Sequence, residues 1–218
     1  NAWVGRAGYG AERRLRGRVA DLRIHSIARS QTEIQSAMKT PCLPNEFGLA
    51  YHFPLDEGGG TQARDAAQQS GVLTGPADWQ ALPHKNYLAF DGSNTFVTIA
   101  STPSGLLPAT LYPPITVEAW VLFSSRSGST AIIDLGAGMG IDNLFLASET
   151  TTTNLRLYTF NGSTMGFIEA VGVIRDGVWM HVAATLDAQT SDGRSPATLY
   201  INGEIKARGQ LPHLQAVY

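Results

Sequence analysis

Short apolar segments recur along the chain from Leu49 onward, and glycine, asparagine, aspartate or proline residues separate them. Such segments are shorter than ordinary helices, and several alternate apolar with polar residues as half-buried strands do. A series of short strands with turn residues between them predicts an all-β fold, an antiparallel two-sheet jelly-roll sandwich. The segments are LAYHFPL, YLAFD, TFVTI, ITVEAWVLF, TAIIDL, DNLFLAS, NLRLYTF, WMHVAATL and ATLYIN.

The segment ITVEAWVLF predicts a strand in the middle of its sheet. Side chains alternate between the two faces of a strand, which places Val117, Ala119 and Val121 on one face and Glu118 with Trp120 on the other. Neither face is plainly polar. We therefore expect this strand to be central.

Two Asn-Gly pairs predict hairpins. Asn161-Gly162 and Asn202-Gly203 each follow an apolar segment. An Asn-Gly pair adopts the positive φ angles that a tight hairpin turn requires. We expect a hairpin at each pair.

One segment predicts a short helix. Ser30 and Glu33 have the spacing of a capping box, in which the serine side chain accepts from the first turn and the glutamate reaches back. Ile34 and Met38 are four residues apart and would face the sandwich. Pro41 ends the run.

The composition argues against several classes of partner. The chain has 218 residues and a formal net charge of −2, so nucleic acid is not an expected partner. Residues 1–38 are nevertheless basic, with seven arginines and three acidic residues. Cys42 is the only cysteine, which excludes an intrachain disulfide. No apolar run approaches the roughly 18 residues that predict a membrane span.

From Gly48 onward the order of segments resembles the bacterial laminin-G-like jelly rolls of the concanavalin A-like lectin/glucanase superfamily. The phrases LAFDGSNTFVTI, ITVEAWVLF, GVWMHVAATLD and ATLYINGEIKARG follow one another as in that family. The family's closing strand and capped helix stand at the start of this chain instead, as GRVADLRI and ARSQTEIQSAM. The resemblance implies that residues 1–38 are the last strands and helix of a jelly roll, 39–47 a linker, and 48–218 its first and central strands.

Three arrangements fit this order of segments. The chain is a circular permutant whose residues 1–38 fold back onto its own sandwich, or it is one period of a tandem array cut within a repeat. In the third arrangement, residues 1–38 complete the sheet of a neighbouring subunit by strand addition. Two strands and a helix bury too little surface to fold by themselves, so we expect residues 1–38 to pack against a sandwich.

The resemblance implies two candidate calcium sites. Asp142 and Asn143 follow a glycine-rich loop, and they resemble the Asp-Asn pair with which pentraxins, relatives of this fold, hold calcium. Asp91 and Asn94 in FDGSNTF are the second candidate, with Asp21 near them in the family's fold. Calcium takes oxygen ligands from carboxylates and amide carbonyls. The alternative at each place is an ordinary turn that side-chain-to-backbone hydrogen bonds stabilise.

Aromatic and basic residues are candidate glycan contacts. Trp3, Tyr9 and Trp79 are the aromatic candidates, and packing at the rim of the sandwich would explain each of them equally well. Arg14 and Arg16 belong to the phrase RRLRGR, which suits a sulfated glycan. Alternating arginines on an edge strand also block unwanted strand pairing, so both interpretations stay open.

The sequence contains no pattern that predicts catalysis. A glycosidase needs two carboxylates across the sugar, and on this fold one strand usually carries both, two or four residues apart. The fold's E-x-D-x-x-E signature is absent, and Glu118 has no second acid at that spacing. Asp56 and Glu57 are adjacent and would point to opposite faces. We therefore expect that the protein is not an enzyme.

These observations lead to two expectations about function. The first is a non-catalytic extracellular or cell-surface laminin-G-like module that acts in adhesion, or as a structural repeat or subunit of a surface assembly or filament. Its partners would be neighbouring copies of itself or adjacent repeats. The second is a calcium-dependent lectin-like module that binds glycans through the loops around Asp142.

Overall fold

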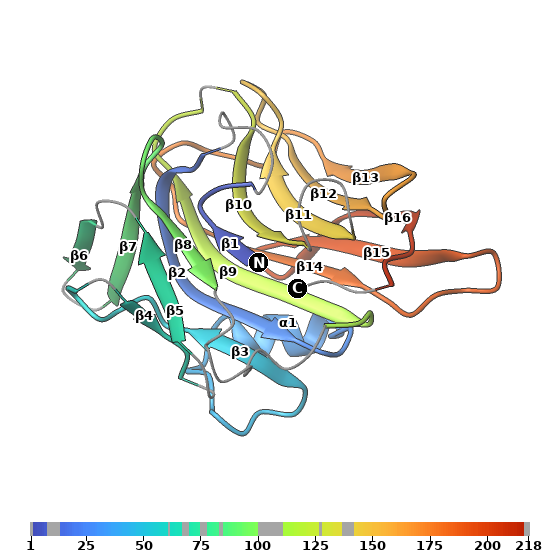
Figure 1. Ribbon diagram of the computed structural model, residues 1–218, viewed down its shortest axis with the longest axis horizontal. Coiled ribbons are helices and arrows are strands. Elements are labelled where there is room, and N and C mark those ends of the chain that lie inside the picture. The colour runs from blue at the N-terminus through green and yellow to red at the C-terminus, as the bar shows by residue number, and fades with distance from the viewer. Residues whose placement is uncertain are drawn as a thin grey trace.

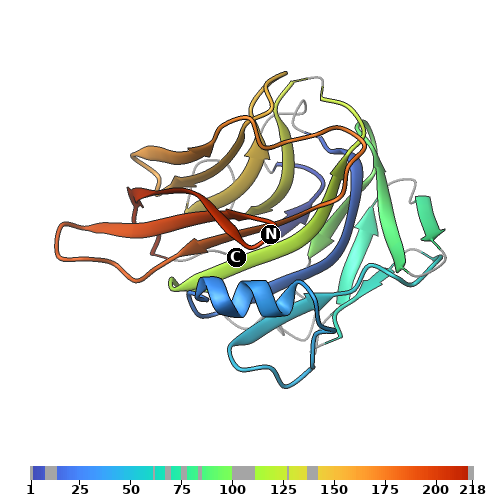
Figure 2. The same ribbon diagram turned by 180° about the vertical axis from the view of Figure 1, so that it is seen from behind.

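The computed structural model describes residues 2–7, 14–60, 62–66, 70–74, 78–82, 85–99, 111–126, 128–136 and 142–215. They form two antiparallel sheets packed face to face and one short helix, as Figures 1 and 2 show from opposite sides. The prediction of an all-β jelly-roll sandwich is confirmed. Within the described part of the chain, no helix is long and apolar enough to cross a membrane.

The first sheet, sheet I, faces the reader in Figure 1. Its strands hydrogen-bond in the order β13, β12, β11, β10, β1, β8, β5, β4. Their bounds in that order are Met165–Ala170, Leu155–Phe160, Asn143–Ser148, Thr130–Leu135, Ala2–Val4, Phe96–Ile99, Ser70–Thr74 and Gln62–Arg64.

The second sheet, sheet II, carries the helix α1 (Gln31–Ala37) on its outer face, which is seen best in Figure 2. Its strands are ordered β16, β15, β14, β9, β2, β7, β6, and β3 pairs with β2 beside them. The bounds in the same order, with β3 last, are Glu204–Pro212, Arg194–Ile201, Met180–Leu186, Ile115–Phe123, Arg16–His25, Lys85–Asp91, Asp78–Leu82 and Leu49–Phe53.

The N-terminal segment supplies interior strands to both sheets of its own chain. β1 pairs with β8 on one side and β10 on the other. β2 pairs with β9 along one edge, and β7 and then β3 pair with the opposite edge. The described part of this segment, residues 2–7 and 14–38, therefore packs against this chain's own sandwich, as the first of the three arrangements requires. The division of the chain at residues 38 and 48 stays a prediction.

The strand β9 occupies the position expected for ITVEAWVLF. It lies between β14 and β2, and Val117, Ala119 and Val121 belong to the core between the two sheets. Glu118 and Trp120 lie on the outer face, where Glu118 is buried and Trp120 half-buried. The prediction of a central strand is confirmed.

The helix α1 forms the predicted capping box. The Glu33 backbone N–H donates to the Ser30 hydroxyl, and the Ser30 backbone N–H donates to the Glu33 carboxylate at 2.7 Å. Ile34 is fully buried against Ala183 of β14, whereas Met38 forms the half-buried C-cap. Of the two residues expected to face the sandwich, Ile34 is therefore fully buried and Met38 is half-buried.

The turn between β15 and β16 holds both the hairpin and α1. Asn202 and Gly203 have φ angles of 52° and 75°, as a tight Asn-Gly turn requires. The Gly203 carbonyl accepts hydrogen bonds from the side-chain amides of Gln31 and Gln35 at 3.0 and 2.9 Å. A Cβ atom on Gly203 would lie 2.6 Å from the Gln35 side chain, so glycine is also required for the close approach of the helix.

The second Asn-Gly pair also forms a hairpin, but with a longer loop. β12 and β13 are joined by residues 161–164, and only Gly162 of the pair has a positive φ angle, 88°. The Asn161 side-chain oxygen accepts from the backbone N–H groups of Ser163 and Thr164 at 3.2 and 2.9 Å. The predicted hairpin is confirmed. Its connection is a four-residue loop capped by the Asn161 side chain, in place of the tight two-residue turn that the Asn-Gly pair indicated.

Candidate functional site

Two arginines and two aromatic residues lie together on the outer face of sheet I. Ala2, Val4 and Val97 point into the core, so Trp3 of β1 and Phe96 of β8 point outward. The Arg6 guanidinium lies 4.5 Å from the centre of the Phe96 ring and 5.7 Å from that of Trp3. The Arg14 guanidinium lies 5.7 Å from the Phe96 ring centre. Trp3, Arg6, Arg14 and Phe96 are called the arginine–aromatic cluster below.

Backbone contacts fix the two arginines beside each other. Arg6 and Arg14 form an isolated antiparallel β-bridge, and the Leu15 N–H donates to the Gly5 carbonyl at 2.9 Å. Gly5 has a φ angle of 80°, and a Cβ there would lie 2.3 Å from the Phe90 ring. Only glycine fits this bend, which leads the chain from β1 towards Arg6.

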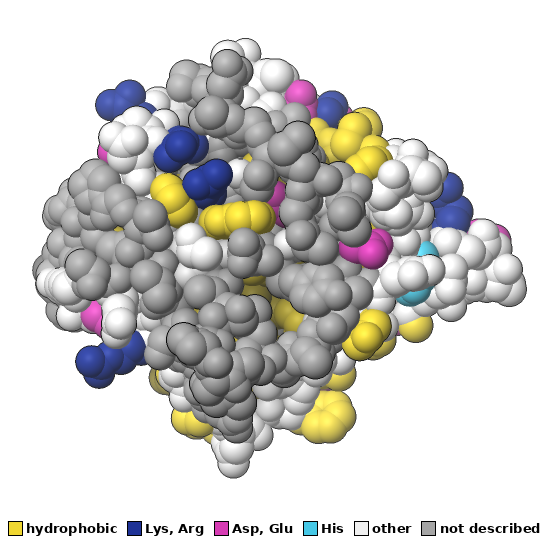
Figure 3. Space-filling view, in the orientation of Figure 1, with side chains coloured by type: hydrophobic (Ala, Val, Ile, Leu, Met, Phe, Trp, Pro, Cys, Tyr) yellow, Lys and Arg dark blue, Asp and Glu magenta, His cyan; other side chains and the backbone are white. Residues whose placement is uncertain are grey.

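The cluster is accessible and positively charged. Trp3, Arg6, Arg14 and Phe96 are all half-buried. Burial and the charge of Arg14 lower the pKa of Arg6, and the nearby Asp134 carboxylate raises it in part. Figure 3 shows basic side chains beside hydrophobic ones on this face of the molecule, next to residues drawn in grey. Two guanidinium groups stacked over one aromatic ring can bind an anionic group beside an apolar surface.

The structure does not gather the described members of the five predicted glycan residues in one place. Trp3 and Arg14 belong to the cluster, whereas Arg16 begins β2 in sheet II, opposite Asp91. Trp79 lies on β6, at the edge of sheet II, and its side chain is outside the described residues. Tyr9 is outside the described residues as well.

Sequence reasoning missed Arg6 and Phe96 as members of the cluster. The alternation in TFVTI was the available signal for Phe96, because Val97 on the inner face places Phe96 on the outer face. Arg6 could not be assigned in this way, because its contact with Phe96 joins strands that are far apart in sequence.

The second candidate calcium site is a side-chain-capped turn. The Asp91 carboxylate accepts from the backbone N–H groups of Ser93, Asn94 and Thr95 at 2.7, 2.8 and 3.1 Å, and from the Ser93 hydroxyl at 2.9 Å. Burial raises the pKa of Asp91, but these donors outweigh it and hold the pKa far below its ordinary value. The Asp91 carboxylate therefore accepts hydrogen bonds from its own turn. This is the ordinary turn that was the alternative to a calcium site at this position.

The prediction that Asp21 lies near Asp91 is wrong. Arg16 is the residue of β2 that pairs with Asp91, and Asp21 lies five residues further along, about 16 Å at the rise of an extended strand. Its carboxylate instead binds Arg23 at 2.8 Å and His52 at 2.9 Å. Asp21 has a φ angle of 54°, at a bulge where β2 changes its register against β9. The family resemblance locates the strand correctly, but the bulge directs this carboxylate elsewhere.

Asp142 and Asn143 point to different surroundings. The Asp142 carboxylate accepts from the Gln215 N–H at 3.3 Å. Asn143 is buried and its side-chain N–H donates to the Asp134 carboxylate at 3.2 Å. Its Oδ1 atom is buried, and no described residue offers it a hydrogen bond. A cation would therefore find oxygen ligands from Asp134 and Asn143, but no group of three or more acidic, histidine or cysteine residues is found in the described ranges.

A family model described as the concanavalin A-like lectin/glucanases superfamily, the laminin-G type, matches residues 91–216. The chain belongs to this laminin-G-like family. Neither the comparison with curated proteins nor that with solved structures finds a match. The matched region includes β8 to β16, and therefore Phe96 and Asp134 but neither arginine of the cluster.

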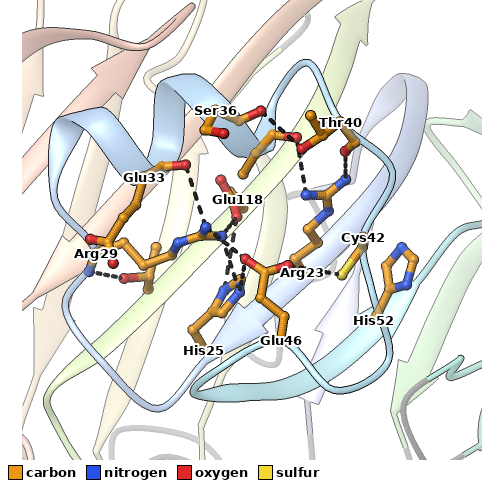
Figure 4. A network of polar contacts seen from close by, with 12 residues as sticks. Arg23, His25, Arg29, Glu33, Ser36, Thr40, Cys42, Glu46, His52 and Glu118 are labelled. Carbon is orange, nitrogen blue, oxygen red and sulfur yellow. Dashed lines mark hydrogen bonds and ion pairs between the residues drawn. The ribbon is translucent and has the colours of Figure 1, made fainter.

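A buried ion network fastens the helix of this laminin-G-like domain to sheet II (Figure 4). Arg29 donates to the Glu118 carboxylate at 2.7 Å and pairs with Glu46 of the 39–47 segment at 2.7 Å. Arg29 also contacts the His25 ring at 3.1 Å. We call these four residues the Glu118 network.

A second arginine extends this attachment. Arg23 donates to the Ala37 and Thr40 carbonyls at 3.1 and 2.9 Å, and so holds the end of α1 and the start of the following segment. The expected linker at 39–47 is thus fastened to sheet II at Thr40 and Glu46.

Burial sets the titration behaviour of the Glu118 network. It raises the pKa of Glu118 to about 7, although the Arg29 charge opposes the shift. Burial and the charge of Arg29 lower the pKa of His25 to about 3. The side chains of Glu118 and His25 have no exposed surface, so the network acts on the attachment of α1 and not on a ligand.

Proposed function

We propose that this laminin-G-like domain is a non-catalytic extracellular binding module that acts in adhesion by holding an anionic glycan on the outer face of sheet I. The arginine–aromatic cluster is the observation that carries the proposal. Guanidinium groups recognise sulfate and carboxylate through paired hydrogen bonds, and the ring faces of Trp3 and Phe96 offer apolar surface for a sugar. Half-buried side chains leave both features accessible.

The arrangement of the acidic residues supports a non-catalytic role. Glycoside hydrolysis needs two carboxylates on either side of the bond to be broken. Glu118 is buried under α1 and bound to Arg29. Glu149 and Glu169, near the outer face of sheet I, both pair with Arg156, at 3.0 and 2.7 Å.

Neighbouring copies or adjacent repeats are the partners that we propose in the assembled state. β1 and β2 form backbone hydrogen bonds with strands on both of their sides. The same pairings could form with the sandwich of a second copy, which is the geometry of an exchanged segment. Subunit exchange between two fluorescently labelled samples tests this, since energy transfer would develop only if copies share segments or a stable interface.

Binding to sulfated, desulfated and neutral oligosaccharides tests the glycan proposal. Arg6→Gln and Arg14→Gln should each weaken the binding of a sulfated chain about ten- to hundredfold, because a hydrogen bond to a charged group contributes about 1.5–3 kcal/mol. Arg208→Gln, an exposed arginine on β16 of the other sheet, is the matched control and should change the affinity less than about twofold. Equal binding of sulfated and neutral chains would contradict the proposal.

Calcium-dependent lectin binding is the second candidate, favoured by one observation at Asn143. Its buried Oδ1 atom lacks a hydrogen-bond partner among the described residues, beside the Asp134 carboxylate. Calcium takes oxygens of both kinds, and Asp134 and Asn143 would each supply one of them. Glycan binding abolished by EDTA and restored by calcium would support this candidate, and binding unaffected by EDTA would support the first.

A further inference from the structure

A cavity of about 470 Å³ lies where the chain crosses from β13 in sheet I to β14 in sheet II. This volume is in the range of small-molecule sites, roughly 300–1,000 Å³. None of the arginine–aromatic cluster is among the described residues that line the cavity. The residues that decide its chemistry are Val171, Arg175, Val178, Trp179, Ile201 and Lys206.

The crossing segment, residues 171–179, is held in place by backbone contacts. The Ile174 N–H donates to the Thr153 carbonyl at 2.9 Å, and the Gly177 N–H donates to the Phe123 carbonyl at 2.7 Å. The Gly172 N–H donates to the Asn154 side chain at 2.9 Å. With three such attachments the cavity is already formed before a ligand arrives, which lowers the entropic cost of binding.

Part of the rim of the cavity is apolar and exposed. Val171 and Val178 keep 72% and 51% of their surface exposed, although both belong to a segment that is firmly attached. Trp179 is half-buried, and the Tyr87 ring meets it edge-on with the ring centres 5.7 Å apart. These side chains offer an apolar surface to part of a ligand.

The charge of the cavity is positive. Arg175 and Lys206 line it, and no carboxylate is found among the described residues that line it. Lys206 pairs with Glu204 at 2.7 Å. Asp176, the neighbour of Arg175, instead binds Arg126 through two hydrogen bonds of 2.8 and 3.0 Å. Among the described residues, Arg175 therefore has no carboxylate partner.

We propose that this cavity binds a small amphipathic carboxylate, with its aliphatic body against Val171, Val178 and Trp179 and its carboxylate on Arg175. A neutral apolar molecule would leave the Arg175 charge without a counterpart. A small polar anion would leave the valines in water. Guanidinium matches the planar carboxylate through two parallel hydrogen bonds, which gives the site its preference for this anion.

Titration calorimetry with three probes tests the proposal. Octanoate has both features, octan-1-ol has the apolar body without the charge, and acetate has the charge without the body. The intact chain should bind octanoate with saturation at one site, octan-1-ol at least tenfold more weakly, and acetate not measurably. No binding of octanoate, or equal binding of octan-1-ol, would overturn the proposal.

Variants then locate the site. Arg175→Gln should weaken octanoate binding about tenfold and leave octan-1-ol binding unchanged, whereas Val178→Ser should weaken both. Arg208→Gln, an exposed arginine on β16 that does not line the cavity, is the control. Arg175 and Val178 are exposed, so the melting temperature should stay the same in both variants and exclude misfolding as the cause. An equal loss in Arg208→Gln, or no loss in Arg175→Gln, would show that octanoate binds elsewhere.

Discussion

Arg29 donates a hydrogen bond of 2.7 Å to the buried carboxylate of Glu118, a residue 89 positions further along the chain. The bond joins the loop before α1 to the middle of β9, and the same guanidinium also reaches Glu46. One arginine thus fastens the helix and the segment that follows it to sheet II.

Glu118→Gln should change how stability depends on pH. Glu118 ionises at about pH 4.5 when unfolded and at about 7 when folded. The folded protein therefore loses stability as the pH rises from 4.5 to 7. The loss is absent below pH 4.5 and complete above pH 7. Between these values the wild type should lose up to about 3 kcal/mol relative to the glutamine variant as pH rises. Urea unfolding at pH 5, 6, 7 and 8 measures it, and parallel curves would contradict it.

His25 should act in the opposite direction at lower pH. Its pKa falls from 6.5 in the unfolded chain to about 3 in the folded one, so the stability it contributes is present above pH 6.5 and lost as pH falls towards 3. In the wild type, proton uptake by Glu118 offsets this loss between about pH 6.5 and 4.5. Glu118→Gln removes the offset, and its stability should fall more steeply over that interval. A stability of Glu118→Gln that stays constant between pH 6.5 and 4.5 would show that His25 is not the titrating group.

Gly203→Ala should destabilise the domain more than Gly128→Ala does. Both glycines have positive φ angles, 75° and 86°. A Cβ at Gly203 meets Gln35 at 2.6 Å, whereas a Cβ at Gly128 meets nothing within 4 Å. The control should cost about 1 kcal/mol from the backbone alone, and Gly203→Ala about 2–3 kcal/mol. Thermal unfolding measures the difference, and equal losses would mean that α1 moves aside at no cost.

Phe96→Leu should weaken the binding of a sulfated glycan without unfolding the domain. The substitution removes the ring that both Arg6 and Arg14 overlie. Cation–π contacts contribute about 0.5–2 kcal/mol, so we expect a loss of affinity of about two- to thirtyfold. If the affinity and the melting temperature are both unchanged, the Phe96 ring does not contribute to binding.

Deletion of residues 1–38 should prevent folding. The deletion removes β1 and β2, and leaves β10 and β9 without a neighbour on one side. The deletion removes the backbone hydrogen bonds along these strand edges. It also removes the core side chains of β2 and the apolar surface that they bury. Far-ultraviolet circular dichroism during thermal unfolding is the measurement. A cooperative transition in residues 39–218 would show that the remaining strands form a domain without them.

The sequence was most informative where a structure depends on neighbouring residues. The capping box at Ser30, the turn at Asn202 and the two faces of β9 each depend on residues a few positions apart, and all three were predicted. The capped turn at Asp91 is equally local, and sequence reasoning recognised it as one of two alternatives.

Contacts between distant segments could not be predicted in this way. Glu118 looked like a lone acid in an apolar strand because Arg29 and Glu46 come from elsewhere in the chain. The Arg6–Phe96 contact depends on β1 lying beside β8, which no local pattern encodes. Asp21 was misplaced because a bulge redirected one side chain within a correctly predicted strand.

The carbonyl of Gly203 accepts two side-chain amides from α1, and thereby joins the first forty residues of the chain to its last twenty. The helix α1 and the β15–β16 hairpin are therefore parts of one cooperative unit, and a cut between them should release neither. A protease that cleaves the exposed threonine loop at residues 151–153 would leave two fragments that stay associated and co-migrate until denaturant is added. The fold of this domain should therefore survive a break in the chain between β11 and β12.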